Sequence, residues 1–448
     1  MASARAPLPL ARLAAAAAAR RRRRAARARC APFAACARGW ADALADDASG
    51  VGSGERGVWS VVVPTYERLP ILRKCLRAMC REGLHLRQGT ARGRAPSAEG
   101  GELGALQWAP LEALEVVLVD DGSSDGTVDW IEAELRGGGL PGDMVRLVKM
   151  GSNGGATRAR NVGIRASRGA VVVFIDSDLV VAEGFLAAHA RALDAAWDAD
   201  GGLDAAFTYG RVVNTDNFEQ PESEPFKLTD RSAAFFATGN VAVSRARLAG
   251  ACALLPPQQH EQQCGGLRKY PDGADAGPFD AQFSSYGWED LELGERLRAL
   301  GARIAHTPEA VGYHYHPALT PVQLPGLMET ERQRGANGAK FLARHPNLRV
   351  ALMTQLTPLH AALWLALTLG GLLSAALYIP VARTLCAAGR PRTAMAVLSP
   401  ALNWRCVRAA FAEATAMARR AVAARLRRLW SGEFGGPPAL TRPSRSIE

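Results

Sequence analysis

The sequence lacks cysteines at the close spacing of metal-binding or redox motifs. The chain of 448 residues has eight cysteines, and no two of them have the C-x-x-C spacing that is typical of zinc sites and redox motifs. The sequence also lacks an internal repeat. We therefore expect neither a structural zinc site nor a disulfide framework, and we interpret the cysteines as ordinary core or surface thiols.

Acidic residues are missing from the start of the chain. None precedes Asp42, whereas residues 1–38 hold ten arginines. Residues 383–448 hold twelve arginines and three glutamates, so the two ends account for more than the whole net charge of +11. The basic balance therefore does not indicate a nucleic-acid partner, and the ends fit solvated arms or an anionic membrane surface better. We interpret residues 1–50 as a disordered basic leader or an organellar transit peptide.

Charge is absent from the 21 residues between Ala361 and Val381. A bilayer core is crossed by about 20 apolar residues in a helix. We therefore expect a transmembrane helix over residues 359–382 and a basic tail over 383–448; the alternative is a buried core helix. Arginines on both sides leave the orientation open. The expected location is a membrane, with a single pass, in a plastid or other organelle or in the Golgi.

Short apolar runs alternate with helical periodicity from Val58 to about Gly312. Strands are expected over VWSVVVP, LEVVLVD, MVRLVKM and AVVVFID, with helical segments between them. This alternation predicts an α/β fold with βαβ units and a parallel sheet that is covered on both faces. Residues 87–110 and 254–278 are rich in glycine and proline, so we expect surface insertions there.

Polar side chains follow three of the expected strands. Thr65 follows the first, Asp120 and Asp121 end the second, and Asp176 and Asp178 end the fourth. Ligands of open α/β sheets bind outside the carboxyl ends of the strands. A pair of aspartates one residue apart suits Mn²⁺ or Mg²⁺, which bridge carboxylates to substrate phosphates, although alone it is more typical of a turn or a cap.

Three further motifs hold residues that suit catalysis or ligand binding. GSNGGATRARNVG places glycines before a helix that carries Arg160, and a helix start favours anions. SSYGWEDLELGERLRALG places Glu289 and Asp290 in the first turn of a helix, where they could equally be capping residues. VGYHYHP offers His314 and His316 as metal ligands.

Taken in order, these motifs resemble the family 2 glycosyltransferases with the GT-A fold. The stretches that carry the resemblance are VVVPTYERLPIL, VVLVDDGSSDGT, NGGATRARNVGI, GAVVVFIDSDLVV, ATGNVAVSRARL and YGWEDLELGERLRALG. The last of them also resembles the C-terminal motif of galactosyltransferases. The resemblance implies a Rossmann-like, mostly parallel sheet with helices on both faces, in a catalytic domain over residues 58–346.

The resemblance also implies roles for individual residues. The nucleotide-sugar would be bound by Thr65, Asp120, Asp121, Arg160, Asp176 and Trp288, with Asp121 at the uracil edge and Trp288 at the sugar. The metal ligands would be Asp176, Asp178 and His314, with His316 as the alternative to His314. Asp290 would be the catalytic base of an inverting enzyme, and Glu289 would help to hold the acceptor. The long insertions leave the acceptor open.

The expected function is a metal-dependent transfer of sugar from a UDP-sugar to a hydroxyl of a glycan, lipid or protein, with inversion. Three alternatives are a retaining glycosyltransferase, a nucleotidyltransferase and a membrane-tethered sugar-binding module without activity. A nucleotidyltransferase would need a basic glycine-rich loop after the first strand, which PTYERLP does not supply. A sugar-binding module without activity would be expected to lose Asp290 or the aspartate pair.

Overall fold

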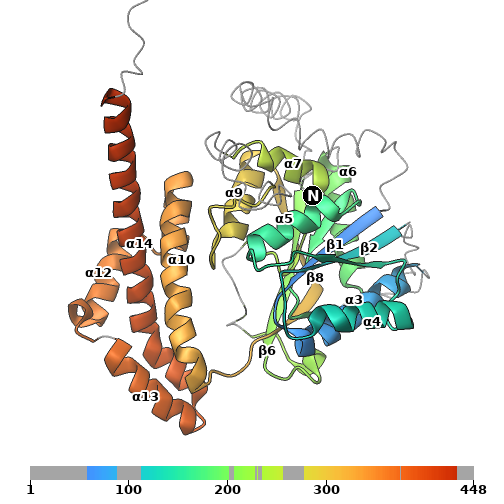
Figure 1. Ribbon diagram of the computed structural model, residues 1–448, viewed down its shortest axis with the longest axis horizontal. Helices are drawn as coiled ribbons and strands as arrows, with labels where there is room; N and C mark the ends of the chain where they lie inside the picture. Colours follow the sequence, from blue (N-terminus) through green and yellow to red (C-terminus); the bar gives the residue numbers. More distant parts are fainter. Residues whose placement is uncertain are drawn as a thin grey trace, which may run out of the picture. The chain divides into compact units, whose positions relative to one another are not determined.

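The computed structural model describes residues 58–87, 113–200, 206–227, 230, 235–255, 277–373 and 375–430 (Figure 1). The expected leader lies outside the described residues, as do nearly all residues of the two expected insertions. The chain divides into two compact units, Met1–Ala318 and Leu319–Glu448. Helix α10 (Leu324–Arg344) belongs to the second unit, although residues 58–346 were expected to form one domain.

The first unit is built on a mixed sheet of eight strands in the order β3-β2-β1-β4-β7-β6-β8-β5. Its first four strands are mutually parallel and are the four that the sequence predicts. They are β1 (Val58–Thr65), β2 (Ala113–Asp120), β3 (Val145–Lys149) and β4 (Val171–Phe174). Their apolar side chains are buried on both faces, as in a sheet that is covered by helices on each side.

The second half of the sheet adds two reversed strands, so the sheet is mixed, with six of its eight strands in one direction, in agreement with the expected mostly parallel sheet. Strand β7 is antiparallel to both β4 and β6, β5 is antiparallel to β8, and β6 is parallel to β8. These strands are β5 (Leu179–Val181), β6 (Ala206–Thr215), β7 (Val241–Ser244) and β8 (Arg303–Tyr315). Leu179, which directly follows Asp178, pairs with His314. Strands β5 and β8 therefore lie side by side next to the aspartate pair.

Helices cover the two faces of the sheet according to the alternation of side chains along the strands. Val61 and Val116 face one side, in one core with residues of α3 (Leu69–Arg87) and α6 (Phe185–Asp200). Val117 and Val119 face the other side, where they pack with α5 (Ala156–Ala166). The remaining helices of this unit are α4 (Thr127–Gly137), α7 (Arg245–Cys252) and α9 (Glu289–Ala299).

The second unit is helical. Its helices are α10, α11 (Leu348–Met353), α12 (Pro358–Leu367), α13 (Ala375–Ala387) and the long α14 (Pro391–Trp430). Leu324 and Met328 of α10 form a core with Ala382 of α13 and with Leu398 and Leu402 of α14. Cys386 and Cys406 lie here and, like the other cysteines within the described ranges, form no disulfide.

The uncharged run from Ala361 to Val381 is not one continuous helix. Helix α12 ends at Leu367, a 3₁₀ turn follows at Leu369–Gly371, and α13 begins at Ala375 with Pro380 inside it. Gly370 and Gly371 have φ of 71° and 90°, which favour glycine and end the helix. Among the described residues, one stretch could cross a membrane by length and composition, Leu348–Leu367, and only 11% of its most apolar window is buried. Most of its apolar side chains therefore lie outside a protein core.

Candidate active site

The ends of β1 and β2 place Thr65 and Asp120 side by side, since these two residues are partners in the parallel register. Asp120 Oδ2 accepts hydrogen bonds from the backbone amides of Gly122 and Ser123, both at 3.1 Å. Thr65 Oγ1 and Asp120 Oδ1 are buried and have no hydrogen-bond partner. Buried polar atoms are normally paired, so these two point to a ligand that supplies the missing partners.

Asp121 holds the glycine-rich loop that precedes α5. Its two carboxylate oxygens accept hydrogen bonds from the amides of Gly154 and Gly155, at 2.7 and 2.8 Å. Burial raises the pKa of Asp121 in spite of these two amides. Gly122 is required here, because it has a φ of 80° and a Cβ would come within 2.8 Å of the Ser152 backbone. The structure therefore gives Asp121 a role in shaping the loop, in addition to the expected contact with a nucleoside.

Arg160 of α5 connects the end of β4 to the start of α9. Its Nη2 lies 2.9 Å from Asp176 Oδ1, and its Nη1 lies 3.3 Å from Glu289 Oε1. Burial alone would lower the pKa of Arg160, but the charges of Asp176 and Glu289 raise it. The guanidinium also lies over the Phe279 ring, 5.8 Å from its centroid. Two of the expected site carboxylates, Asp176 and Glu289, are thus joined by the buried cation of Arg160.

Helix α5 also fixes the segment that leads into α9. The side chain of Asn161 exchanges two hydrogen bonds with the backbone of Phe279, at 2.9 and 3.0 Å, and Thr157 Oγ1 donates to the Phe283 carbonyl at 2.8 Å. Trp288 then has a φ of 75°, which is uncommon for a residue other than glycine. This turn sets the direction in which α9 starts, and it places Glu289 and Asp290 in the first turn of that helix.

Asp290 has a strongly raised pKa at this site. Burial and the neighbouring charge of Glu289 raise the pKa of Asp290 to about 7. Its Oδ1 accepts a hydrogen bond from the Leu291 amide at 2.7 Å, and its charge raises the pKa of Tyr209 in β6, as does the burial of that tyrosine. Glu289 Oε2 is buried without a partner. A carboxylate that titrates near neutral pH is suited to general base catalysis.

Asp178, the second member of the expected aspartate pair, contacts two basic side chains. It forms an ion pair with Arg68, and its Oδ1 lies 3.5 Å from His314 Nε2. Burial would raise the pKa of Asp178, but His314 and Arg68 lower it. Asn214 Oδ1 lies 3.1 Å from His314 Nδ1 and thereby orients the ring, whereas His316 is exposed. The structure therefore favours His314 over His316 as the histidine of the site.

The donor atoms at this edge of the sheet fit a divalent cation that is shared with a substrate. In the part of the chain that the structure describes, no group of three or more His, Cys, Asp or Glu side chains is arranged to hold a metal ion. Asp176, Asp178 and His314 offer carboxylate oxygens and one imidazole. Mg²⁺ is commonly held by one or two carboxylates together with substrate phosphates, and Mn²⁺ also suits oxygen ligands. The residues present fit such a site if the substrate provides the remaining ligands.

Sequence reasoning missed Arg68, Tyr209 and Asn214. Arg68 follows β1 within the PTYERLP motif, so its position at a strand end was the available signal. Tyr209 and Asn214 lie on β6, whose neighbours in the sheet depend on the reversal of β7 and could not be inferred from local patterns.

Replacing Asp290 by asparagine is expected to stabilise the protein above pH 7. The folded pKa of about 7 lies above the ordinary value of 3.8, so the stability that the protonated group contributes is lost as pH rises from about 4 through 7. The neutral amide avoids this loss. After allowance for solvent screening of this half-buried group, we expect a gain of about 1–2 kcal/mol at pH 8 and no gain near pH 4. Thermal melts of the wild type and of Asp290→Asn at the two pH values measure this gain, with Asp129→Asn in the first turn of α4 as control. Equal melting temperatures of the wild type and Asp290→Asn at pH 8 would contradict the raised pKa.

Comparisons with known proteins show similarity to glycosyltransferases. Residues 60–248 match the model of the family described as Glycosyl transferase family 2. Glycosyltransferase GlyG of Streptococcus pneumoniae is 33% identical over 73 residues, which cover 16% of this chain and 23% of that protein. The uncharacterized glycosyltransferase EpsJ of Bacillus subtilis is 26% identical over 123 residues, which cover 27% of this chain and 25% of EpsJ.

The matches thus span a quarter or less of the length of these two relatives. Among solved structures, the mannosyltransferase PcManGT from Pyrobaculum calidifontis, in complex with GDP-Man and Mn²⁺, aligns with a TM-score of 0.42 at 16% identity. The alignment covers 88% of this chain and 99% of PcManGT. The family match extends from β1 through β7 and includes the strand ends, the glycine-rich loop, Arg160 and the aspartate pair. Over residues 60–248, this chain is thus similar in sequence to glycosyl transferase family 2.

Proposed function

We propose that this chain is a metal-dependent glycosyltransferase that moves a sugar from a nucleotide-sugar to an acceptor hydroxyl, with inversion at the sugar carbon. The observation that carries the proposal is the ion-pair network of Arg160 with Asp176 and Glu289, beside Asp290 with a pKa near 7. It joins a donor-side carboxylate to a potential base in one site. The catalytic domain then lies within residues 58–318.

The strand ends and the glycine-rich loop would bind the nucleotide. Thr65 and Asp120 offer the buried atoms without partners, and Asp121 holds the loop before α5 in place. Asp176, Asp178 and His314 would hold Mn²⁺ or Mg²⁺, which when bound would neutralise charge on the diphosphate leaving group. The motif resemblance favours a UDP-sugar as donor, and Trp288 would line the sugar.

Asp290 would act on the acceptor. In its ionised form it would accept the proton of the attacking hydroxyl while the bond from the sugar carbon to the diphosphate breaks. Glu289, which carries a buried oxygen without a partner, would hold the acceptor. Arg160 limits the repulsion among Asp176, Glu289 and Asp290, and its charge lowers the pKa of Asp290, which burial and Glu289 raise to about 7.

The test of this function is a donor screen. The full-length protein would be incubated with UDP-, GDP- and other nucleotide-sugars in the presence of Mn²⁺, and release of nucleoside diphosphate would be measured. We expect one donor to be consumed well above the rest. Asp176→Asn protein is the control, since it should lose this release. Release that is equal in both proteins, or absent with every donor, would contradict the proposal.

We further propose that the second unit attaches the protein to a membrane, where a glycan or lipid acceptor would be met. The observation behind this is the exposure of Leu359, Leu363, Leu365 and Leu367 along α12, at 78, 45, 46 and 47%. A side chain of this size gains about 1.5–3 kcal/mol on leaving water. The finer proposal of a single pass rests on the length and composition of Leu348–Leu367.

Charges on α12 are expected to release the protein from neutral membranes. The full chain should sediment with phosphatidylcholine vesicles, and washing in high salt should not remove it. Leu363→Glu with Leu367→Glu should reduce the bound fraction by about tenfold or more, because each substitution removes apolar area and adds a charge. Val322→Glu is the matched control, since Val322 is 88% exposed in the same unit and lies outside the run. Equal binding by both variants would show that α12 is not the attachment surface.

A further inference from the structure

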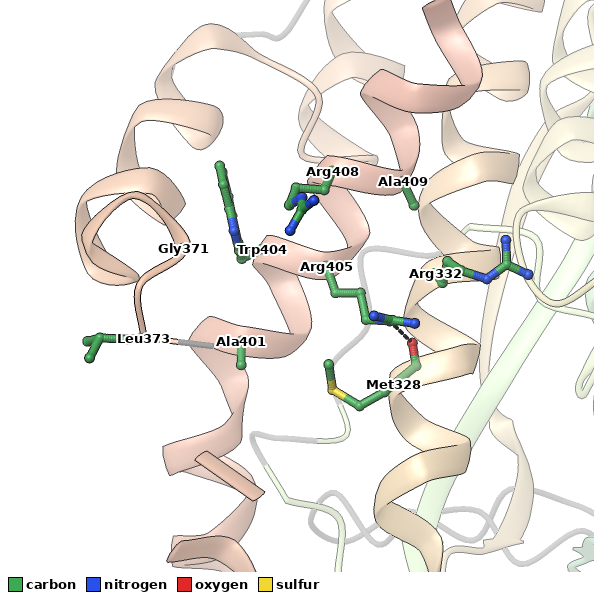
Figure 2. A pocket seen from close by; sticks show the side chains of 9 residues that line it. All are labelled: Met328, Arg332, Gly371, Leu373, Ala401, Trp404, Arg405, Arg408 and Ala409. Carbon is green, nitrogen blue, oxygen red and sulfur yellow. Dashed lines mark hydrogen bonds between the residues drawn. The ribbon is translucent and has the colours of Figure 1, made fainter. Parts of the chain in front are cut away.

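A cavity in the second unit lies apart from the residues used above. Its volume is about 370 Å³, and its walls come from α10, the turn between α12 and α13, and α14 (Figure 2). The lining residues are Met328, Arg332, Gly371, Leu373, Ala401, Trp404, Arg405, Arg408 and Ala409. The walls thus combine apolar side chains with three arginines.

The arginines give the cavity an excess of positive charge. Arg332 is paired with Glu329, its Nη2 lying 2.5 Å from Oε1. Arg405 donates from Nε to the Met328 carbonyl at 2.8 Å, as Figure 2 shows, and this acceptor is neutral. Among the described residues, no carboxylate lies at ion-pair distance from Arg405 or Arg408, and the more distant charge of Arg405 helps Arg332 to lower the pKa of Glu329. Guanidinium groups are suited to binding phosphate through paired hydrogen bonds.

The indole of Trp404 adds a donor without an acceptor. Its Nε1 is buried and has no hydrogen-bond partner. The Nε1 atom lies against the turn at Gly371, where a Cβ would come within 2.8 Å of it and φ is 90°. Gly371 therefore allows the indole to stand at the cavity wall; Figure 2 shows Trp404 on the side of Gly371 and Arg405 directed toward Met328. A buried N–H without an acceptor points to a polar ligand, independently of the charge of the arginines.

Exposed leucines continue from the cavity onto the neighbouring surface. Leu369 and Leu372, in the turn that forms one wall, are 58 and 83% exposed, and Leu367 at the end of α12 is 47% exposed. Leu373 lines the cavity itself. A ligand that fills the cavity with an anionic group would therefore meet apolar protein surface directly beside it.

We propose that this cavity, hereafter the headgroup cavity, binds the phosphate of an anionic phospholipid. Arg405, Arg408 and the Trp404 N–H contact the phosphate oxygens, and the acyl chains lie over the leucines of α12 and the following turn. The cavity volume falls within the range of about 300–1,000 Å³ that is common for small-molecule sites. A lipid fits better than a free phosphate ion because the surface beside the cavity is apolar.

The test compares vesicles of phosphatidylcholine alone with vesicles that also contain phosphatidylglycerol. The full-length protein should bind the anionic vesicles more tightly. Arg405→Gln with Arg408→Gln should remove most of that gain, about fivefold for each arginine, the factor to which about 1 kcal/mol per charge near a membrane surface corresponds. The control pair, Arg383→Gln with Arg419→Gln, removes the same charge from exposed positions outside the cavity and should stay within about threefold of the wild type.

A second variant guards against misfolding of the first, since Arg405 also ties α14 to Met328. Ala409→Phe fills the headgroup cavity without a change of charge. It should lose the preference for anionic vesicles while its binding to neutral vesicles is unchanged. The proposal is overturned if both arginine pairs lose binding equally, or if Ala409→Phe keeps the wild-type preference. It is also overturned if inorganic phosphate alone raises the melting temperature through these arginines while the vesicle preference survives their loss, which would show a free-phosphate site.

Discussion

Replacing Asp290 by asparagine is expected to reduce sugar transfer by about 10²–10⁴-fold, the usual contribution of a positioned base. The amide is nearly isosteric with the carboxylate but cannot accept the proton of the acceptor hydroxyl. Asp129→Asn, the same change in the first turn of α4, should leave the rate unchanged. Rates from the two variants at saturating donor, measured as product formed, give the comparison. A near-normal rate for Asp290→Asn would assign the base to another group, with Glu289 as the first candidate.

The same reasoning predicts how transfer depends on pH. The pKa of Asp290 is raised to about 7, so the base is protonated and inactive at lower pH. We expect kcat/KM to fall about tenfold for each pH unit below 7. Glu289 contributes to the raised pKa, so Glu289→Gln should move this fall to lower pH, whatever its effect on the maximal rate. An acid limb that stays at the same pH in Glu289→Gln would contradict the coupling between the two carboxylates.

Removal of divalent metal is expected to abolish transfer. EDTA should reduce the rate to background, and Mn²⁺ or Mg²⁺ in excess should restore it, because charge on the departing diphosphate would otherwise be poorly stabilised. Asp178→Asn should stay inactive even at saturating metal, because an amide is a poor substitute for a carboxylate ligand. Asp129→Asn again serves as the control. Full activity in the presence of EDTA would refute the assignment of Asp176 and Asp178.

The parallel half of the sheet could be predicted from the sequence because its signals are local. Buried parallel strands read as continuous apolar runs, and each is followed by a helix with its own periodicity. β1, β2, β3 and β4 therefore appear where the patterns place them, and α5 spans Ala156–Ala166 as its motif predicts. The carboxyl ends of these strands face one edge, so Thr65, Asp120 and the aspartate pair could be assigned to one site before their side chains were seen.

The rest depends on contacts between distant segments. The position of β7 between β4 and β6 cannot be inferred from any single strand, and it decides which side chains of β6 and β8 lie at the site. The pairing of Arg68 with Asp178 and of Arg160 with Glu289 joins residues that are 110 and 129 positions apart. The break at Gly370 inside the uncharged run was also missed, because composition alone does not reveal where a helix ends.

The measurement that tests the central claim most directly pairs donor binding with turnover in Asp290→Asn. Calorimetry with the preferred nucleotide-sugar and Mn²⁺ gives the affinity, and a transfer assay on the same preparation gives the rate. If Asp290 is the base at the site joined by Arg160, the affinity stays within about threefold of the wild type while transfer falls by about 10²–10⁴-fold. Unchanged transfer with intact binding, or loss of donor binding with the transfer rate per bound donor preserved, would contradict the account.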